Sequence, residues 1–505
     1  MNKIRLIKKN DASCKVIKKW DTVVYLPLLL LWAGICIGAP LENWRQPFFN
    51  IASEFEHSAG APSRMFWDNS GDAALFDTSL WIASVVKERN CWMIEPAVSG
   101  GVGKPFKESA FFFHGDFFNY IRFNRFTGWQ SLDVDSRYKY DSRYPAHVGR
   151  TFIGRIEEAA LQVDWCNGFI RIGRQKRSWG PFPDRSLILS PNPYSYDAVE
   201  WQLFGNFFEF RYLFAPFASR YSSSDSDNGS SRDRYFAAHS LNFIVGKWAT
   251  FGFTETVLFT REQGMPDLQY INPLSLYSVI NTNQEGNGNL MLGFQWNIHP
   301  GMESVSFRGQ FVLDDFQIDN EVVTDNEPAH WGIDAGLFWK NPLPALRYEH
   351  LIKCEYTYAS EWLYTVPDIT AEQGERYTFI GKSLGLPFID GSRLRLGATM
   401  VPERIGAFGF SVAYAHRGGN TELSKWHDNE HIPGLPFDSD IPVEYRISLS
   451  GEALLYFKDY AHLTIVGEPG WVWNKNNRLH EQFEFDPAFS VLLSVHFSNG
   501  ILRFR

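Results

Sequence analysis

The stretch "LRYEHLIKCEYTYA", residues 346–359, alternates between two kinds of side chain with a period of two. Side chains on a β-strand point alternately to its two faces, so this stretch is predicted to be a strand with one apolar and one charged face. The apolar face carries Tyr348, His350, Ile352, Cys354, Tyr356 and Tyr358, and the other face carries Arg347, Glu349, Lys353, Glu355 and Thr357.

The same alternation recurs in "VSFRGQFVLD" (305–314), "RLRLGATM" (393–400) and "VEYRISLS" (443–450). The stretch "ALQVDWCNGFIRIG" (160–173) is predicted to be a β-hairpin. Its two-residue turn is expected at Asn167-Gly168, because both residue types tolerate positive φ.

Two properties of these strands favour a membrane β-barrel over a water-soluble β-sandwich, which also alternates. The apolar faces are rich in Phe, Tyr and Trp, which are typical of the aromatic girdles of outer-membrane barrels. The opposite faces mix Arg with Glu, as a polar lumen would. The predicted class is therefore all-β, a transmembrane antiparallel β-barrel, which must close because an open sheet edge in lipid would leave backbone groups unpaired.

Composition and charge narrow the function classes. The chain has 505 residues, 16 % of them aromatic, and a formal net charge of −9. An acidic chain without a concentrated basic surface is not expected to bind nucleic acid. The cysteines beyond residue 39 are Cys91, Cys166 and Cys354. They are dispersed and form no Cys/His cluster, so neither a disulfide scaffold nor a metal site is expected.

The N-terminus is predicted to direct export. Residues 1–39 combine a basic start with the apolar run "TVVYLPLLLLWAGICIGA" and are interpreted as a signal peptide cleaved after Ala39. A retained anchor helix is the alternative. Residues 40–90 are expected to form a short segment on the periplasmic side, with one amphipathic helix over 72–89, and residues 91–505 the barrel.

Six segments of the predicted barrel resemble the Wzi-like capsule assembly family of outer-membrane β-barrels. They are "GRQKRSWGP" (173–181), "SLILSPNP" (186–193), "INPLSLY" (271–277), "GNLMLGFQW" (288–296), "RGQFVLDDF" (308–316) and, more loosely, "YTFIGKSLGLPFIDGSRLRLG" (377–397). The resemblance implies a barrel of about 18 strands whose periplasmic mouth is closed by an N-terminal helical element. It also implies a lectin-like role in holding or organising capsular polysaccharide at the cell surface.

Enzymatic activity is not expected. Neighbouring residues of a strand face opposite ways, so neither Glu157-Glu158 nor Asp314-Asp315 should form a facing carboxylate dyad. No nucleophile elbow, phosphate-binding loop or zinc-protease motif is present, and no cofactor is implied.

The candidates for binding polysaccharide or lining the lumen are Arg171, Arg174, Arg177, Trp179, Arg308, Glu349, Arg393 and Arg395. Such arginines can pair with lumen carboxylates and stiffen the barrel, or they can hold acidic sugars while Trp179 stacks on a sugar ring. Arg171 and Arg174 differ in parity, so both reach the lumen only if a bulge or strand end lies near Gly173.

Three functions follow as alternatives: a glycan-binding surface barrel, a diffusion channel, and a soluble exported β-rich protein. For the first two, the expected location is the outer membrane of a diderm bacterium. The expected partners are membrane lipid, the barrel-assembly machinery and surface polysaccharide, with the protein a monomer.

Overall fold

The computed structural model describes most of the chain from Asn90 onward. The described residues are 66–67, 73–74, 90–103, 110–136, 147–148, 151–152, 154–182, 185–217, 233–246, 248–261, 265–283, 288–301, 304–315, 330–367, 375–402, 406–421, 424–426, 442–457, 461–479, 483–486, 489–496 and 501–503. The predicted signal peptide lies outside them, as does the helix predicted over 72–89, apart from the two-residue strand β2 (Ala73–Ala74).

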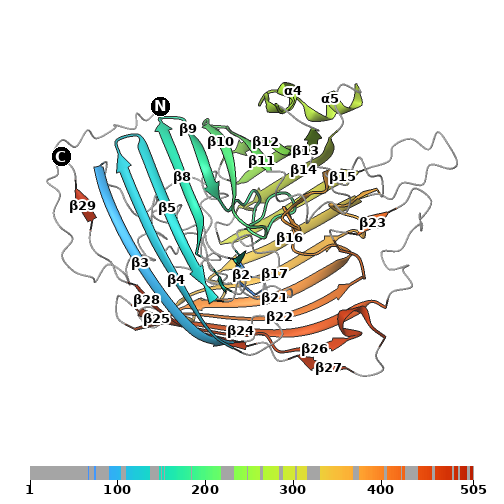
Figure 1. Cartoon of the computed structure of the whole chain (residues 1–505). Coiled ribbons are helices and arrows are strands. Elements are labelled where there is room, and N and C mark those ends of the chain that lie inside the picture. Colours follow the sequence, from blue (N-terminus) through green and yellow to red (C-terminus); the bar gives the residue numbers. More distant parts are fainter. Residues whose placement is uncertain are drawn as a thin grey trace.

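The described strands form a closed antiparallel barrel of 18 strands, which confirms the predicted fold class (Figure 1). Neighbours in the barrel are neighbours in the sequence, and the pairing of β9 with β10 and of β28 with β3 leaves no open edge. Two of the 18 strands are interrupted. One consists of β25 and β26, which both pair with β24. The other consists of β27, which pairs with β26, and of β28 and β29, which both pair with β3.

The bounds of the barrel strands follow the chain. They are β3 (Asn90–Gly103), β4 (Ala110–Phe123), β5 (Phe126–Asp135), β8 (Arg155–Trp165), β9 (Gly168–Gln175), β10 (Tyr196–Phe204), β11 (Phe208–Phe217), β12 (Asp233–Val245), β13 (Ala249–Arg261), β14 (Asn289–Ile298), β15 (Val305–Asp315), β16 (His330–Lys340), β17 (Glu349–Ala359), β21 (Gly391–Val401), β22 (Gly406–Arg417), β24 (Glu444–Phe457), β25 (Ala461–Gly467), β26 (Gly470–Trp473), β27 (Glu484–Asp486), β28 (Phe489–His496) and β29 (Ile501–Arg503).

Short elements complete the described structure. They are the strands β1 (Phe66–Trp67), β6 (His147–Val148), β7 (Thr151–Phe152), β18 (Val366–Pro367), β19 (Thr378–Phe379), β20 (Lys382–Ser383) and β23 (Lys425–Trp426), the helices α4 (Leu268–Ile271) and α5 (Tyr277–Thr282), and the 3-10 turn η6 (Lys475–Asn477). In the described part of the chain, no helix has both the length and the apolar character needed to cross a membrane.

The predicted alternation is present in the strands. On β17, Ile352, Cys354 and Tyr356 are exposed on the outer face, whereas Lys353 and Glu355 are buried on the lumen face. Strands β15, β21 and β24 alternate in the same way. His350 is the exception on β17, because its ring is held in the turn before the strand, where Nε2 accepts the backbone N–H of Leu343 at 2.9 Å.

Connection lengths differ between the two ends of the barrel. One end has tight turns, as between β8 and β9, and the other has connections such as 176–195, 218–232 and 360–390. Bacterial barrels place short turns in the periplasm and long loops outside the cell, so the two ends are called the turn end and the loop end. Large aromatic side chains are exposed at the turn end, where an interfacial girdle belongs: Phe126, Phe207, Trp248, Trp339 and Tyr348.

The predicted β8–β9 hairpin is confirmed, but its turn lies one residue earlier than expected. Trp165 pairs with Gly168, so Cys166 and Asn167 are the two turn residues. Gly168 is needed for another reason. A Cβ atom there would lie 2.1 Å from the backbone oxygen of Gln202, so β9 can approach β10 this closely only with a glycine.

Candidate functional site

Two loops from the loop end fold back into the lumen. The first inward loop, residues 176–195, joins β9 to β10, and the second inward loop, residues 360–390, joins β17 to β21 and is described at 360–367 and 375–390. Figure 1 shows the chain between β9 and β10 running inside the ring of strands. Leu187, Tyr364 and Leu384 from these loops are fully buried in one apolar cluster with lumen-facing residues such as Leu213 and Phe236.

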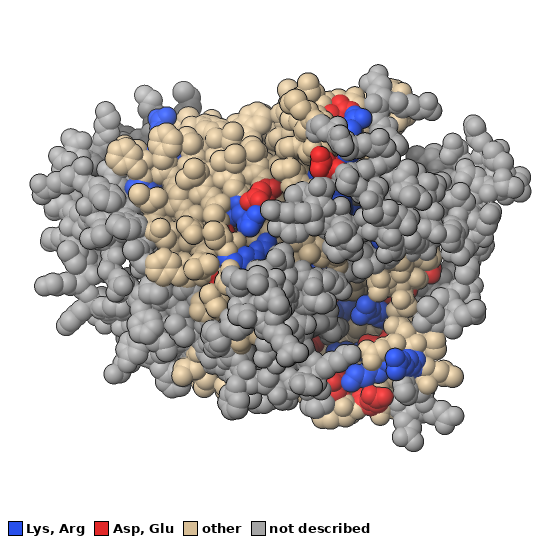
Figure 2. All heavy atoms as spheres, viewed as in Figure 1, with Lys and Arg blue, Asp and Glu red and all other residues tan. Residues whose placement is uncertain are grey.

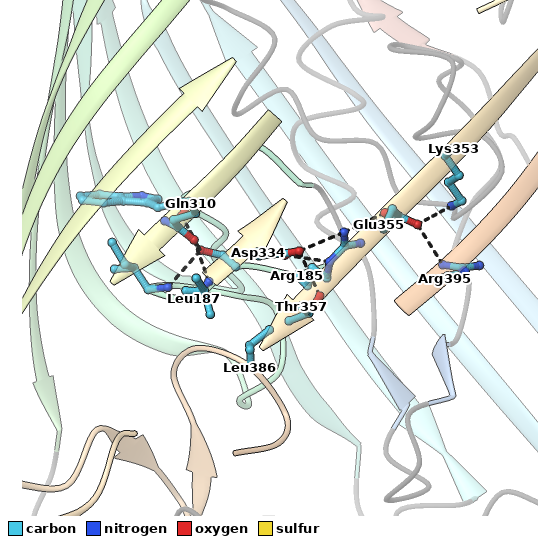
Figure 3. A network of polar contacts seen from close by, with 12 residues as sticks. Arg185, Leu187, Gln310, Asp334, Lys353, Glu355, Thr357, Leu386 and Arg395 are labelled. Atoms are coloured by element: carbon cyan, nitrogen blue, oxygen red, sulfur yellow. Dashed lines mark hydrogen bonds and ion pairs between the residues drawn. The ribbon is translucent and has the colours of Figure 1, made fainter. Parts of the chain in front are cut away.

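The first inward loop is fixed to the wall at β15 by an amide side chain. Gln310 Oε1 accepts the backbone N–H of Leu187 at 2.7 Å, and Gln310 Nε2 donates to the carbonyl of Trp179 at 3.2 Å. Ser186 Oγ donates to the same carbonyl and lies 2.9 Å from Gln310 Oε1 (Figure 3). Buried polar groups without partners are costly, so this arrangement selects one position for the loop.

The same loop is held at β16 and β17 by a charged network, which Figure 3 shows from close by. Arg185 Nε donates to Asp334 Oδ2 at 2.8 Å, and Arg185 Nη2 lies 2.7 Å from Glu355 Oε1. Glu355 Oε2 lies 3.3 Å from Lys353 Nζ and 3.8 Å from Arg395 Nη1. The opposite charges alternate along this line, so each buried carboxylate has a cation beside it.

The two inward loops are hydrogen-bonded to each other. Tyr364 Oη donates to the carbonyl of Leu187 at 2.6 Å and accepts the N–H of Leu386 at 3.2 Å. The N–H of Ser190 donates to the carbonyl of Leu384 at 2.8 Å. Burial raises the pKa of Tyr364 well above its usual value, so the hydroxyl keeps the proton that it donates.

A second charged group lies where the first inward loop leaves β9. Lys176 Nζ is 4.0 Å from Glu157 Oε1, and Arg155 Nε is 3.4 Å from Glu157 Oε2. Burial lowers the pKa of Lys176 to about 8, and the attraction of Glu157 offsets this only in part.

The expectation that Glu157 and Glu158 face opposite ways is wrong. Both side chains are buried, because the register between β5 and β8 shifts at this point: Ser131 pairs with Glu158, but Leu132 pairs with Ile156. A β-bulge of this kind inserts one extra residue and turns two successive side chains to the same side. Glu157 thereby reaches Arg155 and Lys176.

Three of the predicted site residues are structural members of this buried region. Arg171 Nε donates to Gln162 Oε1 at 2.8 Å, and its Nη1 lies 3.6 Å from Glu200 Oε2. Arg177 Nη1 donates to the carbonyl of Tyr196 at 2.8 Å. The side chain of Trp179 is only 4 % exposed, so its ring has no open face for a sugar.

Arg174 does not face the lumen. The pairing of β9 with β8 and β10 runs without a register shift through Gly173, so the bulge that would have turned Arg174 inward is absent. Arg174 lies on the outer face with Ile170 and Ile172 and donates to Asp197 Oδ2 at 2.7 Å.

The remaining predicted residues lie on the lumen face and are more open. Arg308 stacks on the ring of Phe338, 5.0 Å from its centre, and Glu349 is half-buried near the turn end. Arg393 is more open than Arg395, with 39 % of its side chain exposed against 16 %. Arg393 Nη2 lies 3.7 Å from Glu468 Oε1.

Near the loop end, Arg393 and the strands that follow it in the barrel carry two groups of paired charged side chains. We call Arg393, Arg395, Arg446, Glu468, Lys475, Glu484 and Asp486 the charged path. Arg446 pairs with Asp486, which also lies 3.3 Å from Lys475 Nζ. Figure 2 shows blue and red side chains side by side over the part of the molecule where β26 and β27 lie. This path offers both cationic forks and carboxylates to a polar ligand entering from the loop end.

Sequence reasoning missed Arg185, Asp334 and the inward course of the second inward loop. Asp334 has the lumen parity of β16 and could have been found by extending the alternation to that strand. Nothing local marks Arg185, since its partner is 149 residues away in the chain. In the part of the chain that the structure describes, no group of His, Cys, Asp and Glu side chains could hold a metal ion.

The comparisons with known proteins agree with the fold. No family model matches the sequence, and no curated protein matches it. Among solved structures, the chain is similar to Wzi of Escherichia coli, described as an outer membrane protein involved in group 1 capsule assembly and a carbohydrate-binding β-barrel. The TM-score is 0.57 at 12 % identity, over 94 % of this chain and 98 % of that one.

Two Occ proteins are also among the similar structures. OccAB4 of Acinetobacter baumannii has a TM-score of 0.46 at 8 % identity, over 82 % of this chain and 99 % of that one. OccK3 of Pseudomonas aeruginosa has a TM-score of 0.44 at 8 % identity, over 81 % and 96 %. The chain thus has the fold of an outer-membrane β-barrel, and its apolar outer wall does not fit the alternative of a soluble exported protein.

Proposed function

We propose that this protein is an outer-membrane barrel that binds and organises polysaccharide at the cell surface, in a lectin-like and non-catalytic role. The observation that carries the proposal is the meeting of the two inward loops in the lumen: they come from opposite parts of the wall and share a fully buried apolar cluster. Such a cluster narrows the path for solutes and gives a rigid scaffold for a surface ligand. The likeness to a carbohydrate-binding β-barrel supports the same role.

The ligand class follows from the charged path. Hydroxyl groups of sugars are served by both carboxylates and guanidinium groups, and the arginines add a preference for acidic sugars. Arg393 is the residue proposed to make the main contact, because its side chain is more exposed than that of its neighbour Arg395 and lies near the loop end of β21. The buried Arg171, Arg177 and Trp179 are assigned to holding the first inward loop in place.

Binding of defined polysaccharides to the refolded or detergent-extracted protein tests the proposal. Polygalacturonate is the acidic probe and dextran the neutral one, immobilised on a biosensor surface. We expect wild type to retain polygalacturonate, and Arg393→Ala to weaken binding roughly tenfold, since a charge-assisted hydrogen bond contributes about 1.5–3 kcal/mol. Arg174→Ala, on the outer face, is the matched control. Absence of binding by wild type to both probes would count against the proposal.

A diffusion channel is the second candidate, because charged side chains line the lumen from the loop end down to Glu355. A channel would conduct small ions in a planar bilayer without retaining polysaccharide. Both candidate functions imply an outer-membrane location, a barrel made of one chain, and folding by the barrel-assembly machinery.

A further inference from the structure

The segment after β13 lies outside the barrel wall. Residues 265–283, which contain α4 and α5, pass over the loop ends of β12, β13 and β14 (Figure 1). On β12, Phe236 and Ala238 belong to the cluster inside the lumen, so Tyr235 and Ala237 point the other way. These outward residues pack against the underside of the segment, together with Val257 and Phe259 of β13. The residues that the segment contributes are Tyr270, Tyr277 and Ile280.

The segment is tied to the wall by hydrogen bonds. Tyr212 Oη on β11 donates to the carbonyl of Ile271. Glu255 on β13 accepts the N–H of Tyr277 at 2.9 Å and the hydroxyl of Ser278 at 2.6 Å. The segment is therefore a fixed cover with a defined outer side.

The cover hides a polar pair. His239 Nε2 lies 3.1 Å from Glu255 Oε2, and both residues stand on the outward face of their strands. A carboxylate turned toward hydrocarbon without partners is expensive. Tyr277 and Ser278 of the segment donate hydrogen bonds to Glu255. The segment therefore covers this polar part of the wall and presents its own outer surface in its place.

That outer surface is mainly apolar, with Asn272, Thr282 and Asn283 as its exposed polar residues. Five large side chains of the segment are between 49 % and 81 % exposed: Met265, Leu268, Leu274, Leu276 and Val279. Asp267 is the one charged residue of the segment, and it pairs with Arg261. A water-exposed or glycan-binding surface would carry more polar side chains than this.

We propose that the outer surface of residues 265–283 is a lipid-contact surface, seated among the acyl chains of the outer leaflet. The surface continues the wall below it, where Phe243, Phe253 and Leu292 of β12, β13 and β14 are exposed. Because the segment covers the polar pair His239–Glu255, the lipid-facing band of the barrel extends further toward the loop end. The inference rests on the membrane location of the proposed function and not on its ligand.

Collision accessibility of a spin label tests this surface. In a background with Cys91, Cys166 and Cys354 replaced by serine, Leu274→Cys is labelled with a nitroxide and the protein is placed in nanodiscs of phosphatidylcholine with phosphatidylglycerol. The lipid control is the natural Cys354, which is exposed on the outer face of β17, in a background lacking the other two cysteines. The aqueous control is Arg478→Cys, an exposed position after η6.

We expect the label at 274 to collide with oxygen more often than with a water-soluble nickel chelate, with a ratio within about twofold of that at Cys354. A ratio like that at 478 would overturn the inference, as would strong dipolar broadening between labels, which would mean that a second copy covers the segment. If the label at Cys354 also behaved as aqueous, the membrane location itself would fail. Val279→Cys replaces Leu274→Cys if the latter does not show the heat-shifted band of a folded barrel.

Discussion

Arg185 and Asp334 meet inside the barrel although 149 residues separate them in the chain, with Arg185 Nε 2.8 Å from Asp334 Oδ2. Asp334 is fully buried on β16, and Arg185 comes from the first inward loop. A carboxylate in this position requires a cation, and the loop supplies it. The pair therefore links the fold of the wall to the filling of the lumen.

Arg185→Ala should loosen the first inward loop. Removing one partner of a buried pair leaves the other uncompensated, so the free energy of unfolding should fall by about 3 kcal/mol. Urea unfolding in detergent micelles, followed by the heat-shifted band, measures this. Arg174→Ala removes the exposed pair with Asp197 and should cost at most about 1 kcal/mol. Equal losses for the two variants would contradict the assigned role of Arg185.

Tyr364→Phe should weaken the contact between the two inward loops while leaving the ring packing intact. The hydroxyl donates to Leu187 and accepts from Leu386, so its loss leaves two buried backbone groups unsatisfied. We expect a loss of about 1–3 kcal/mol in the free energy of unfolding and faster proteolysis of the loops. Tyr356→Phe, on the exposed outer face of β17, is the control and should change neither.

Gly168→Ala should distort the start of β9. The added Cβ would meet the backbone oxygen of Gln202 at 2.1 Å, so the two strands must separate locally. Thermal loss of the folded band should occur at a lower temperature than in wild type, with a cost of about 1–3 kcal/mol. Gly115→Ala on β4 is the matched control, because a Cβ there meets no atom within 4 Å. If Gly168→Ala left the unfolding temperature unchanged, β9 and β10 would have to be further apart than described.

Lys176 should make stability depend on pH. Its pKa is about 8 in the folded protein, against a usual value of 10.5. Between these values the unfolded chain binds a proton that the folded protein has released, so the free energy of unfolding rises with pH across this window. Below the window Lys176 is charged in both states and adds no pH dependence. Unfolding midpoints of wild type should therefore rise relative to Lys176→Gln from pH 8 to pH 10. Parallel curves for the two proteins would show that Lys176 does not titrate in this range.

The strands could be predicted from the sequence because their signal is local. Alternation on β17 assigns Lys353 and Glu355 to one face and Ile352 and Cys354 to the other, and a closed barrel leaves only lumen and lipid for those faces. The bulge at Glu157 could not be predicted, since it depends on the register with β5, which no single strand encodes.

The candidate site was predictable only in part, for the same reason. Arg393 and Arg395 follow the parity of β21 and lie on the lumen face as expected. Arg174 lies outside because the register at Gly173 is regular. The inward course of the second inward loop rests on contacts such as Tyr364 with Leu187, which join distant parts of the chain and leave no local pattern.

The central proposal is that the two inward loops, which meet inside the lumen, block the passage of solutes and that the protein holds a surface ligand. Planar-bilayer recording of the purified full-length barrel tests this most directly. We expect wild type to insert without steady conductance, and Arg185→Ala to show intermittent opening as its loop is released. Steady ohmic current through wild type would contradict the account.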